Sequence, residues 1–241
     1  MRKCVILCRV GAAAALAWML ALSAYAGSFS VDPVRLTVRA RATSTSLSLQ
    51  NNGDEPVLVQ SEVMAWSQQD GNDLLTPSQD LLISPPIFKL APGAAQTVRV
   101  GLLRPSDPER ELTYRIFLQE VPAPLLPGQE GVHAVLRLGL PVFVLPSRRA
   151  VPLLNWRAAQ GAEGQIKLSL SNSGNAHVQA IDCKLYRPDG TLIAEQKLTA
   201  YVLPGQARSW QITPNQPWRG ETLKLSARTD AGDVTAEIVP E

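Results

Sequence analysis

Short alternating segments separated by turn residues are the feature that most constrains the fold of this chain. Segments 46–49 and 166–170 alternate polar and apolar residues, and asparagine–glycine turns follow them at 51–54 and 172–175. Similar runs recur at a spacing of about 8–12 residues, which is typical of β-sandwiches. Downstream of the N-terminus no segment keeps a helical period over several turns, although 79–83 is compatible with one turn of helix. The sequence therefore predicts an all-β protein.

The length suits two sandwiches in tandem. The chain has 241 residues, of which 45% are apolar and 18% are charged, so it can bury a core and does not resemble a disordered tail. Segment 146–152 has a proline at each end and charge between them. It leaves about 120 and about 90 residues on its two sides, each enough for one sandwich. We therefore predict domains at 27–147 and 148–241.

The N-terminus has the pattern of a cleaved export signal. Three basic residues among the first nine precede an uncharged apolar run at 10–22, and the small–x–small triplet Ala24–Tyr25–Ala26 follows. The run is shorter than the ~20 apolar residues that a membrane-spanning helix needs. We therefore predict a signal peptide at 1–26 and an exported chain without stable membrane insertion.

Residues for catalysis or metal binding are scarce. The two histidines, His133 and His177, have no histidine, cysteine or suitably spaced carboxylate beside them in the sequence, so we expect no metal site and no cofactor. The sequence has no nucleophile elbow and no glycine-rich phosphate loop. Cys183 is the one cysteine after the leader, and its alternating apolar run favours a small buried hydrophobe over a nucleophile. The pattern indicates that the protein is not an enzyme, and its near-neutral charge gives no reason to expect nucleic-acid binding.

Segment 132–145 stands apart from the other predicted strands. Its seven alternate residues from Val132 to Val144 are all apolar, and Pro141 lies inside the run. Proline cannot donate a ladder hydrogen bond, so it favours an edge strand or a bulge, and a long apolar edge strand aggregates unless something covers it. Two interpretations stay open. The segment is either a core-lining strand of its own sandwich or a strand that lends its edge and its side chains to another chain.

Several motifs, taken in order, resemble the periplasmic pilus-assembly chaperones of the chaperone–usher pathway, the PapD-like family, and within it a divergent archaic-type branch. The most specific is Pro-Pro-x-x-x-Leu-x-Pro-Gly at 85–93 followed by an alternating strand. The motifs lie at 30–35, 50–53, 65–66, 84–93, 97–100 and 114–122, and the alternating strand runs to Pro146. The resemblance covers essentially the whole chain after the leader. It implies two Ig-like β-sandwiches set at an angle and a periplasmic location.

The resemblance also implies a function. Members of this family bind pilus subunits that lack their last strand, insert a strand of their own, and pass the subunit to an outer-membrane usher. This chain would then be a chaperone whose partners are pilus subunits and an usher, and whose free edge can instead pair with a second copy. The residues that would fill the subunit are Val132, Ala134, Leu136, Leu138 and Leu140.

The family holds the C-terminal carboxylate of the subunit with two basic residues in the cleft between its domains. Arg35 matches the first of them. The second is usually a lysine and falls on Pro141 here. We therefore expect Arg115, on the neighbouring strand, to replace it, with Arg137 as a weaker alternative. Arginine suits a carboxylate because it can bind both oxygens at once.

An ionic contact between the domains is a further feature that the resemblance implies. Glu120 and Asp230 match its two acidic positions. The basic position falls near Leu145, which has no charge, so we expect Arg148 or Arg149 to serve instead.

Two other classes of protein fit the sequence less well than a chaperone. A structural pilus subunit or adhesin would have one incomplete sandwich, a free alternating N-terminal extension and a pair of cysteines. A secreted glycan hydrolase would need paired carboxylates in a cleft with aromatic platforms. The tryptophans at 66, 156, 210 and 218 instead fall where sandwich cores could use them.

Overall fold

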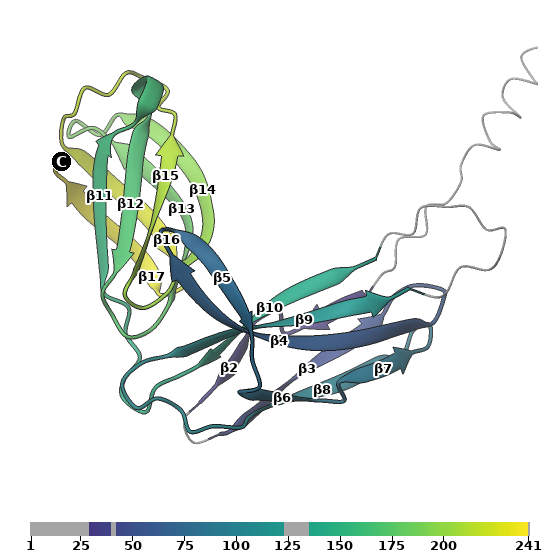
Figure 1. The fold of residues 1–241 in the computed structure, drawn as a ribbon. Coiled ribbons are helices and arrows are strands. Elements are labelled where there is room, and N and C mark those ends of the chain that lie inside the picture. The colour runs from purple at the N-terminus through teal and green to yellow at the C-terminus, as the bar shows by residue number, and fades with distance from the viewer. Residues whose placement is uncertain (1–28, 40–41, 123–134, 241) are drawn as a thin grey trace, which may run out of the picture.

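The computed structural model describes residues 29–39, 42–122 and 135–240, which form two β-sandwich lobes joined at an angle (Figure 1). This confirms the prediction of an all-β chain with two sandwiches in tandem. The predicted signal peptide lies outside the described residues. The predicted division between Ser147 and Arg148 falls in the connection between the last strand of the first lobe and the first strand of the second. Within the described ranges, no helix has the length and apolar character needed to span a membrane.

Two sheets pack face to face in the first lobe. One has the strand order β1-β3-β8-β6, and the other has the order β2-β10-β9-β4-β5, with β7 also paired to β4. The strands are β1 (Phe29–Asp32), β2 (Leu36–Val38), β3 (Ser44–Asn51), β4 (Val57–Gln69), β5 (Asn72–Pro77), β6 (Leu81–Ser84), β7 (Ile87–Leu90), β8 (Ala95–Leu102), β9 (Leu112–Val121) and β10 (Arg137–Val144). The suggested turn of helix at 79–83 is wrong, because β6 pairs with β8 there. The peptide bonds Asp32–Pro33 and Ser84–Pro85 are cis.

The second lobe repeats this design with a three-stranded and a four-stranded sheet. Their strand orders are β11-β12-β15 and β14-β13-β16-β17. The elements are β11 (Leu154–Gln160), the short 3-10 helix η1 (Ala162–Gly164), β12 (Ile166–Asn172), β13 (Val178–Tyr186), β14 (Leu192–Val202), β15 (Gln206–Ile212), β16 (Leu223–Thr229) and β17 (Gly232–Ile238).

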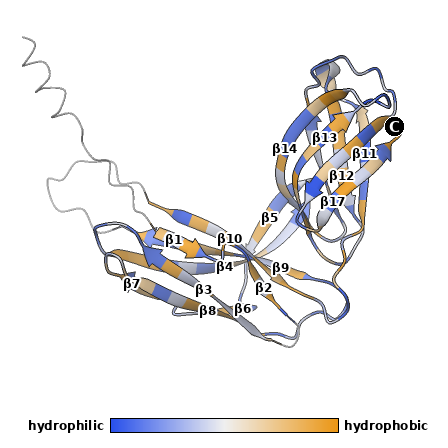
Figure 2. Cartoon of the chain, turned by 180° about the vertical axis from the view of Figure 1, so that it is seen from behind, coloured by the Kyte–Doolittle hydropathy of each residue, from blue (hydrophilic) through white to orange (hydrophobic). Residues whose placement is uncertain are grey.

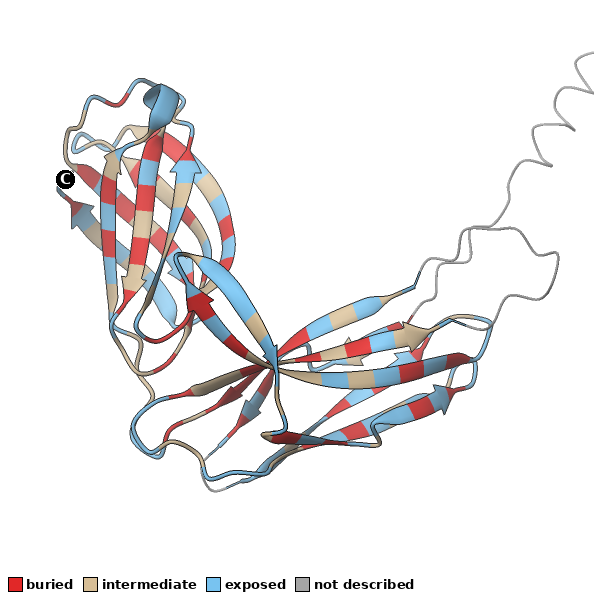
Figure 3. Cartoon of the chain, viewed as in Figure 1, coloured by how far each residue is buried: buried red, intermediate tan, exposed pale blue. Residues whose placement is uncertain are grey.

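Each lobe has its own apolar core, because alternate residues of each strand point between its two sheets. Burial and hydropathy alternate along the strands in step (Figures 2 and 3). Leu49 and Val98 are fully buried in the first lobe, and Leu168 and Val178 in the second. Leu49, Val98 and Leu168 belong to segments whose alternation predicts one buried face.

Cys183 lies in the core of the second lobe and is 1% exposed. Burial raises the pKa of its thiol to about 12, and the charge of the neighbouring Asp182 acts in the same direction. The thiolate that a nucleophile needs is therefore scarce at neutral pH. The interpretation of Cys183 as a small buried hydrophobe is confirmed.

In each lobe, the side chain of a buried asparagine stabilises the turn that follows a strand by hydrogen bonds to the backbone. Asn51 ends β3, donates from Nδ2 to the carbonyl oxygens of Glu55 and Leu90, and accepts the N–H of Gly53. Asn172 ends β12 and donates to the carbonyl oxygens of Ala176 and Val202, at 2.7 and 3.1 Å. Its Oδ1 accepts the N–H groups of Leu153 and Gly174. The asparagine–glycine turns that the two halves of the sequence share thus have one structural role.

Replacing Asn172 with alanine is expected to lower the free energy of unfolding by about 2–4 kcal/mol, because two carbonyl and two amide groups lose their partner in a buried site. Chemical denaturation of the full chain measures this loss. The neighbouring Ser173 is exposed, so Ser173→Ala is the matched control and should stay within about 0.5 kcal/mol of the parent. Equal losses in both variants would contradict the assigned role.

The lobes touch through the hairpin of β4 and β5, which reaches from the first lobe to the second (Figure 1). Gln68 on this hairpin donates to the carbonyl oxygen of Tyr201 and accepts the N–H of Leu203, both at 3.0 Å. Trp66 and Phe143 of the first lobe pack with Leu203 of the second in a small buried cluster. The angle between the lobes is therefore held by side chains from both of them.

Candidate functional site

The first half of β10 has an open edge. The strand pairs with β9 over its whole length, from Arg137 to Val144. On the other side β2 pairs only with Val142–Val144. Within the described part of the chain, no strand pairs with the far side of 137–141. These residues therefore form an edge strand of the first lobe.

The backbone of every second residue of β10 points to this open edge. The N–H of Glu120 on β9 donates to the carbonyl oxygen of Leu136, at 2.9 Å. In an antiparallel pair, both backbone groups of one residue face the same side and those of the next residue face the other. Arg137, Gly139 and Pro141 therefore present their backbone groups to the open edge. Pro141 has no N–H to leave unpaired there, which explains how the strand tolerates it.

From Leu136 into β10, the alternate apolar side chains become more buried along the chain. Leu136 and Leu138 are partly buried and pack at the border of the core of the first lobe, whereas Leu140 is 5% exposed. The prediction that Leu140 could fill a subunit is corrected, since its side chain already belongs to the core of its own lobe. Val132 and Ala134 lie outside the described residues. The structure thus leaves Leu136 and Leu138 as the described side chains at the open end of the core.

The other face of β10 packs against Phe117 of β9. A Cβ atom built on Gly139 would lie 2.9 Å from the Phe117 ring, so glycine allows the ring to lie against the strand. The guanidinium carbon of Arg137 lies 4.0 Å from the centre of the same ring, and its NH2 lies 3.0 Å from Oε2 of Glu62. The Arg137 guanidinium therefore already contacts Phe117 and Glu62 on the face of the sheet. Arg115 is the better candidate for the second basic residue that would bind the subunit carboxylate.

The two candidate anchors, Arg35 and Arg115, lie around Tyr201 of the second lobe. Burial raises the pKa of the Tyr201 hydroxyl, while the positive charges of both arginines act against that rise. Arg35 NH1 lies 2.6 Å from Oδ2 of Asp230, and the Arg35 side chain is 41% exposed. The structure therefore brings both arginines to the cleft between the lobes, and Arg35 is already paired with a carboxylate of the second lobe.

Arg115 lies directly opposite Pro141 on the neighbouring strand, as expected. Its guanidinium carbon lies 4.2 Å from the centre of the Trp66 ring, and its NH2 lies 3.3 Å from Asp73. Asp73 also accepts from Arg208 of the second lobe, at 2.6 Å. The Nε atom of Arg115 is buried and has no hydrogen-bond partner among the described residues. Asp73 thus satisfies only part of the guanidinium group.

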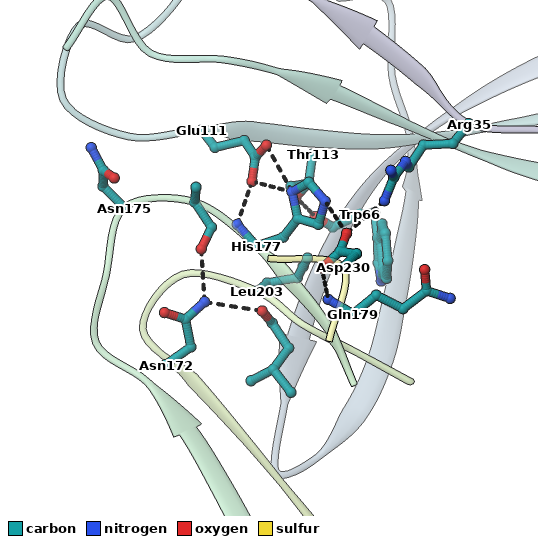
Figure 4. Close-up of polar contacts among 12 residues, drawn as sticks. Arg35, Trp66, Glu111, Thr113, Asn172, Asn175, His177, Gln179, Leu203 and Asp230 are labelled. Carbon is teal, nitrogen blue, oxygen red and sulfur yellow. Dashed lines mark hydrogen bonds and ion pairs between the residues drawn. The ribbon is translucent and has the colours of Figure 1, made fainter. Parts of the chain in front are cut away.

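A buried ionic cluster joins the lobes beside Arg35 (Figure 4). His177 Nδ1 lies 2.9 Å from both carboxylate oxygens of Glu111, and Oε2 of Glu111 also accepts the backbone N–H of His177. His177 Nε2 lies 3.6 Å from Oδ2 of Asp230. The imidazole ring stacks on Phe143 of β10, with 3.4 Å between ring centres. Glu111 and Phe143 belong to the first lobe, and His177 and Asp230 to the second.

This cluster revises the predicted contact between the domains. Asp230 takes part, as expected. Glu120 does not, because it lies at the opposite end of β9 from the lobe interface and pairs with Leu136. Arg148 instead forms an ion pair with Glu109, 2.6 Å away, and its side chain is 72% exposed.

Sequence reasoning missed the two central residues, Glu111 and His177. They lie 66 positions apart, so no local spacing links them. One signal was available, because Glu111 stands immediately before an apolar strand. The segment before it contains several charged residues of both signs, so Glu111 does not stand out in the sequence.

The charges in the cluster shift two pKa values. Burial alone lowers the pKa of His177, but the carboxylates of Asp230 and Glu111 outweigh burial and raise it above its ordinary 6.5. Burial alone raises the pKa of Asp230, but His177, the N–H of Gln179 and Arg35 lower it overall. Both shifts favour the charged forms. The cluster is therefore most stable as an ion network.

Solved structures of pilus chaperones share this fold. The CsuC–CsuE chaperone–tip subunit complex from archaic Csu pili of Acinetobacter baumannii is 20% identical, with a TM-score of 0.65, and the match covers 89% of this chain and 99% of that chain. The Salmonella enterica SafB chaperone complex with SafA pilin gives 19% identity and a TM-score of 0.62, over 90% and 98%. The E. coli chaperone DraB gives 19% and 0.61, over 88% and 97%. No curated protein sequence matched the chain.

The first lobe also matches a family model. The model describes the N-terminal domain of PapD, a pili and flagellar-assembly chaperone, and matches residues 28–150, just over half of the chain. That range contains β10 and both candidate arginines. With two Ig-like sandwiches in tandem and this match, the chain belongs to the PapD-like family of pilus-assembly chaperones.

Proposed function

We propose that this protein captures pilus subunits in the periplasm by strand addition along β10 and passes them to an outer-membrane usher. The observation that carries the proposal is the open edge at 137–141. Half-buried Leu136 and Leu138 lie at the same end of the core. A client with a missing strand could pair its backbone with this edge and cover both side chains. Full burial of an exposed leucine contributes about 1.5–3 kcal/mol, and each of these half-buried leucines would contribute part of that amount.

The extent of backbone pairing follows from Pro141. Arg137 and Gly139 can each offer an N–H to an incoming strand, but Pro141 cannot, and β2 occupies the edge from Val142 onward. The pairing with a client should therefore end near Pro141. The end of the client strand would then lie beside Pro141, whose partner on the next strand, β9, is Arg115. In this proposal Arg115 and Arg35 bind the terminal carboxylate of the client, since arginine can bond both of its oxygens.

Hydrogen exchange tests the proposal at the level of single amides. The full chain is compared alone and in complex with a pilus subunit of the host cell, co-produced in the periplasm. The amides of Arg137 and Gly139 should exchange fast in the free protein and slowly in the complex, while the amide of Leu138, already directed toward β9, should change little. A stable complex without new protection at 137 and 139 would contradict strand addition on this edge.

A further inference from the structure

The carboxylate of Asp230, in the cleft, contacts a basic side chain from each lobe. Oδ2 of Asp230 lies 2.6 Å from NH1 of Arg35 and 3.6 Å from Nε2 of His177. The other oxygen, Oδ1, accepts the N–H of Gln179 at 2.7 Å. Asp230 is therefore the link between the candidate anchor on the first lobe and the buried histidine of the second lobe (Figure 4).

The charge of His177 depends on groups from several elements of both lobes. Glu111, immediately before β9, contacts Nδ1 of His177. Asp230, in the turn after β16, lies near Nε2, and its carboxylate also pairs with Arg35. Tyr201 of β14 and Phe143 of β10 complete the surroundings, with ring centres 5.7 and 3.4 Å from the imidazole. The His177 side chain is only 13% exposed. Its charge is therefore balanced by these groups and not by solvent.

A carboxylate that binds Arg35 would disturb this balance in a defined direction. If it displaced Asp230, Oδ2 would lose its nearest cation, and His177 would become the remaining positive partner. If it bound Arg35 beside Asp230, it would add a negative charge near the imidazole. In both cases protonated His177 becomes more favourable. By linkage, a complex that binds a proton more tightly than the free protein is stabilised as the pH falls.

We propose that His177 is a positioning residue for Arg35, acting through Asp230, and that protonation of His177 strengthens the binding of a client carboxylate at Arg35. The inference rests on the proposed function for its client, whereas the link from Arg35 through Asp230 to His177 belongs to the free protein. Protonated His177 holds Asp230 in place and frees Arg35 for the incoming carboxylate. Neutral His177 leaves Arg35 as the main partner of Asp230, and the two carboxylates then compete.

The link can be tested without any client, by following the His177 ring by NMR in the full chain across pH, with His177→Gln used to assign its signal. In the parent the pKa of His177 should lie above 6.5. Arg35→Ala should raise it further, by about 0.5 or more, and Asp230→Asn should lower it. Arg99→Ala removes an exposed arginine from the opposite sheet and should leave it unchanged. An unchanged pKa in both Arg35→Ala and Asp230→Asn would overturn the inference.

The consequence for binding can be tested with a synthetic peptide of roughly ten residues that alternates valine and serine. It is prepared with a free C-terminal carboxylate and, as a control, with a C-terminal amide. The carboxylate peptide should bind the parent about three- to tenfold more tightly near pH 6 than near pH 8, and the amide peptide should show no such change. His177→Gln should remove the pH dependence, and binding near pH 6 should become as weak as near pH 8.

The outcomes separate the inference from the proposed function. A carboxylate peptide that binds more tightly than the amide at every pH, with no pH dependence, would support Arg35 as an anchor and overturn the role of His177. Equal binding of the two peptides would overturn the carboxylate anchor itself, and with it any role of His177 in capture. Failure of both peptides to bind would count against strand addition on β10, while the NMR titration would still decide the link within the free protein.

Discussion

Leu138→Asp is expected to abolish capture of pilus subunits, with a loss of affinity of about 100-fold or more. The half-buried leucine would become fully buried in the shared core of the complex, which contributes part of the ~1.5–3 kcal/mol that full burial of a leucine is worth. An aspartate at that point would in addition have to lose its hydration without a partner. Every 1.4 kcal/mol is about tenfold in affinity, so the two effects together exceed two orders of magnitude. The measurement is the yield of chaperone–subunit complex purified from cells that produce both proteins.

The control for this variant must separate capture from folding, because Leu138 already packs at the border of the core in the free protein. Leu82 is a leucine on β6 of the opposite sheet and is 54% exposed. Leu82→Asp introduces the same charge on a strand of the same lobe and should leave the yield of complex unchanged. Thermal unfolding shows whether Leu138→Asp is folded at the temperature of the capture experiment. A folded Leu138→Asp protein with a normal yield of complex would contradict the role of β10.

Arg35→Ala is expected to weaken capture by about 10- to 100-fold, because a charge-assisted hydrogen bond contributes roughly 1.5–3 kcal/mol. The variant leaves the apolar side chains of β10 in place. It also leaves Asp230 with the N–H of Gln179 and with His177 as partners, so the lobe interface should persist. Arg115→Ala should weaken capture as well, and the double variant should bind worst. Dissociation rates of the purified complexes measure these differences.

Arg99→Ala is the control that shows whether the effect of Arg35→Ala is specific to that site or follows from the loss of any positive charge. Arg99 is an exposed arginine on β8, in the opposite sheet of the same lobe. Its removal changes the net charge equally and should not change the dissociation rate. If Arg115→Ala abolished capture and Arg35→Ala had no effect, the assignment of Arg35 as the first anchor would be wrong. Arg115 would then be the anchor that matters.

Alternation and turn residues predicted the strands well, because a strand with one buried face must repeat its side-chain type every second residue. The division of the chain into two sandwiches followed from a proline-flanked segment and from the lengths of chain on its two sides. Asn51 and Asn172 could be recognised as turn residues from sequence. Their burial, and the carbonyl groups that they hold, could be seen only once the strands were packed.

The cleft was predicted in part. Arg35 and Asp230 were selected by family position, and the structure places them 2.6 Å apart, although they were assigned to two different tasks. Glu111 and His177 were missed because their partnership depends on the angle between the lobes, which no local pattern encodes. Leu140 was misjudged for a related reason. A repeat of apolar residues shows which face a side chain is on, but not where the core of one lobe ends and an open edge begins.

The most direct test of the account is site-specific photocrosslinking from position 136, immediately before β10 and its open edge, in cells that are assembling pili. The account predicts one adduct, with the mass of the chaperone plus a single pilus subunit, that disappears when Leu138→Asp is introduced into the same chain. An adduct with a second copy of the chaperone alone would show that the edge is closed by self-pairing and does not hold a subunit. No adduct with any subunit during active assembly would contradict the central claim and would make β10 an ordinary core strand.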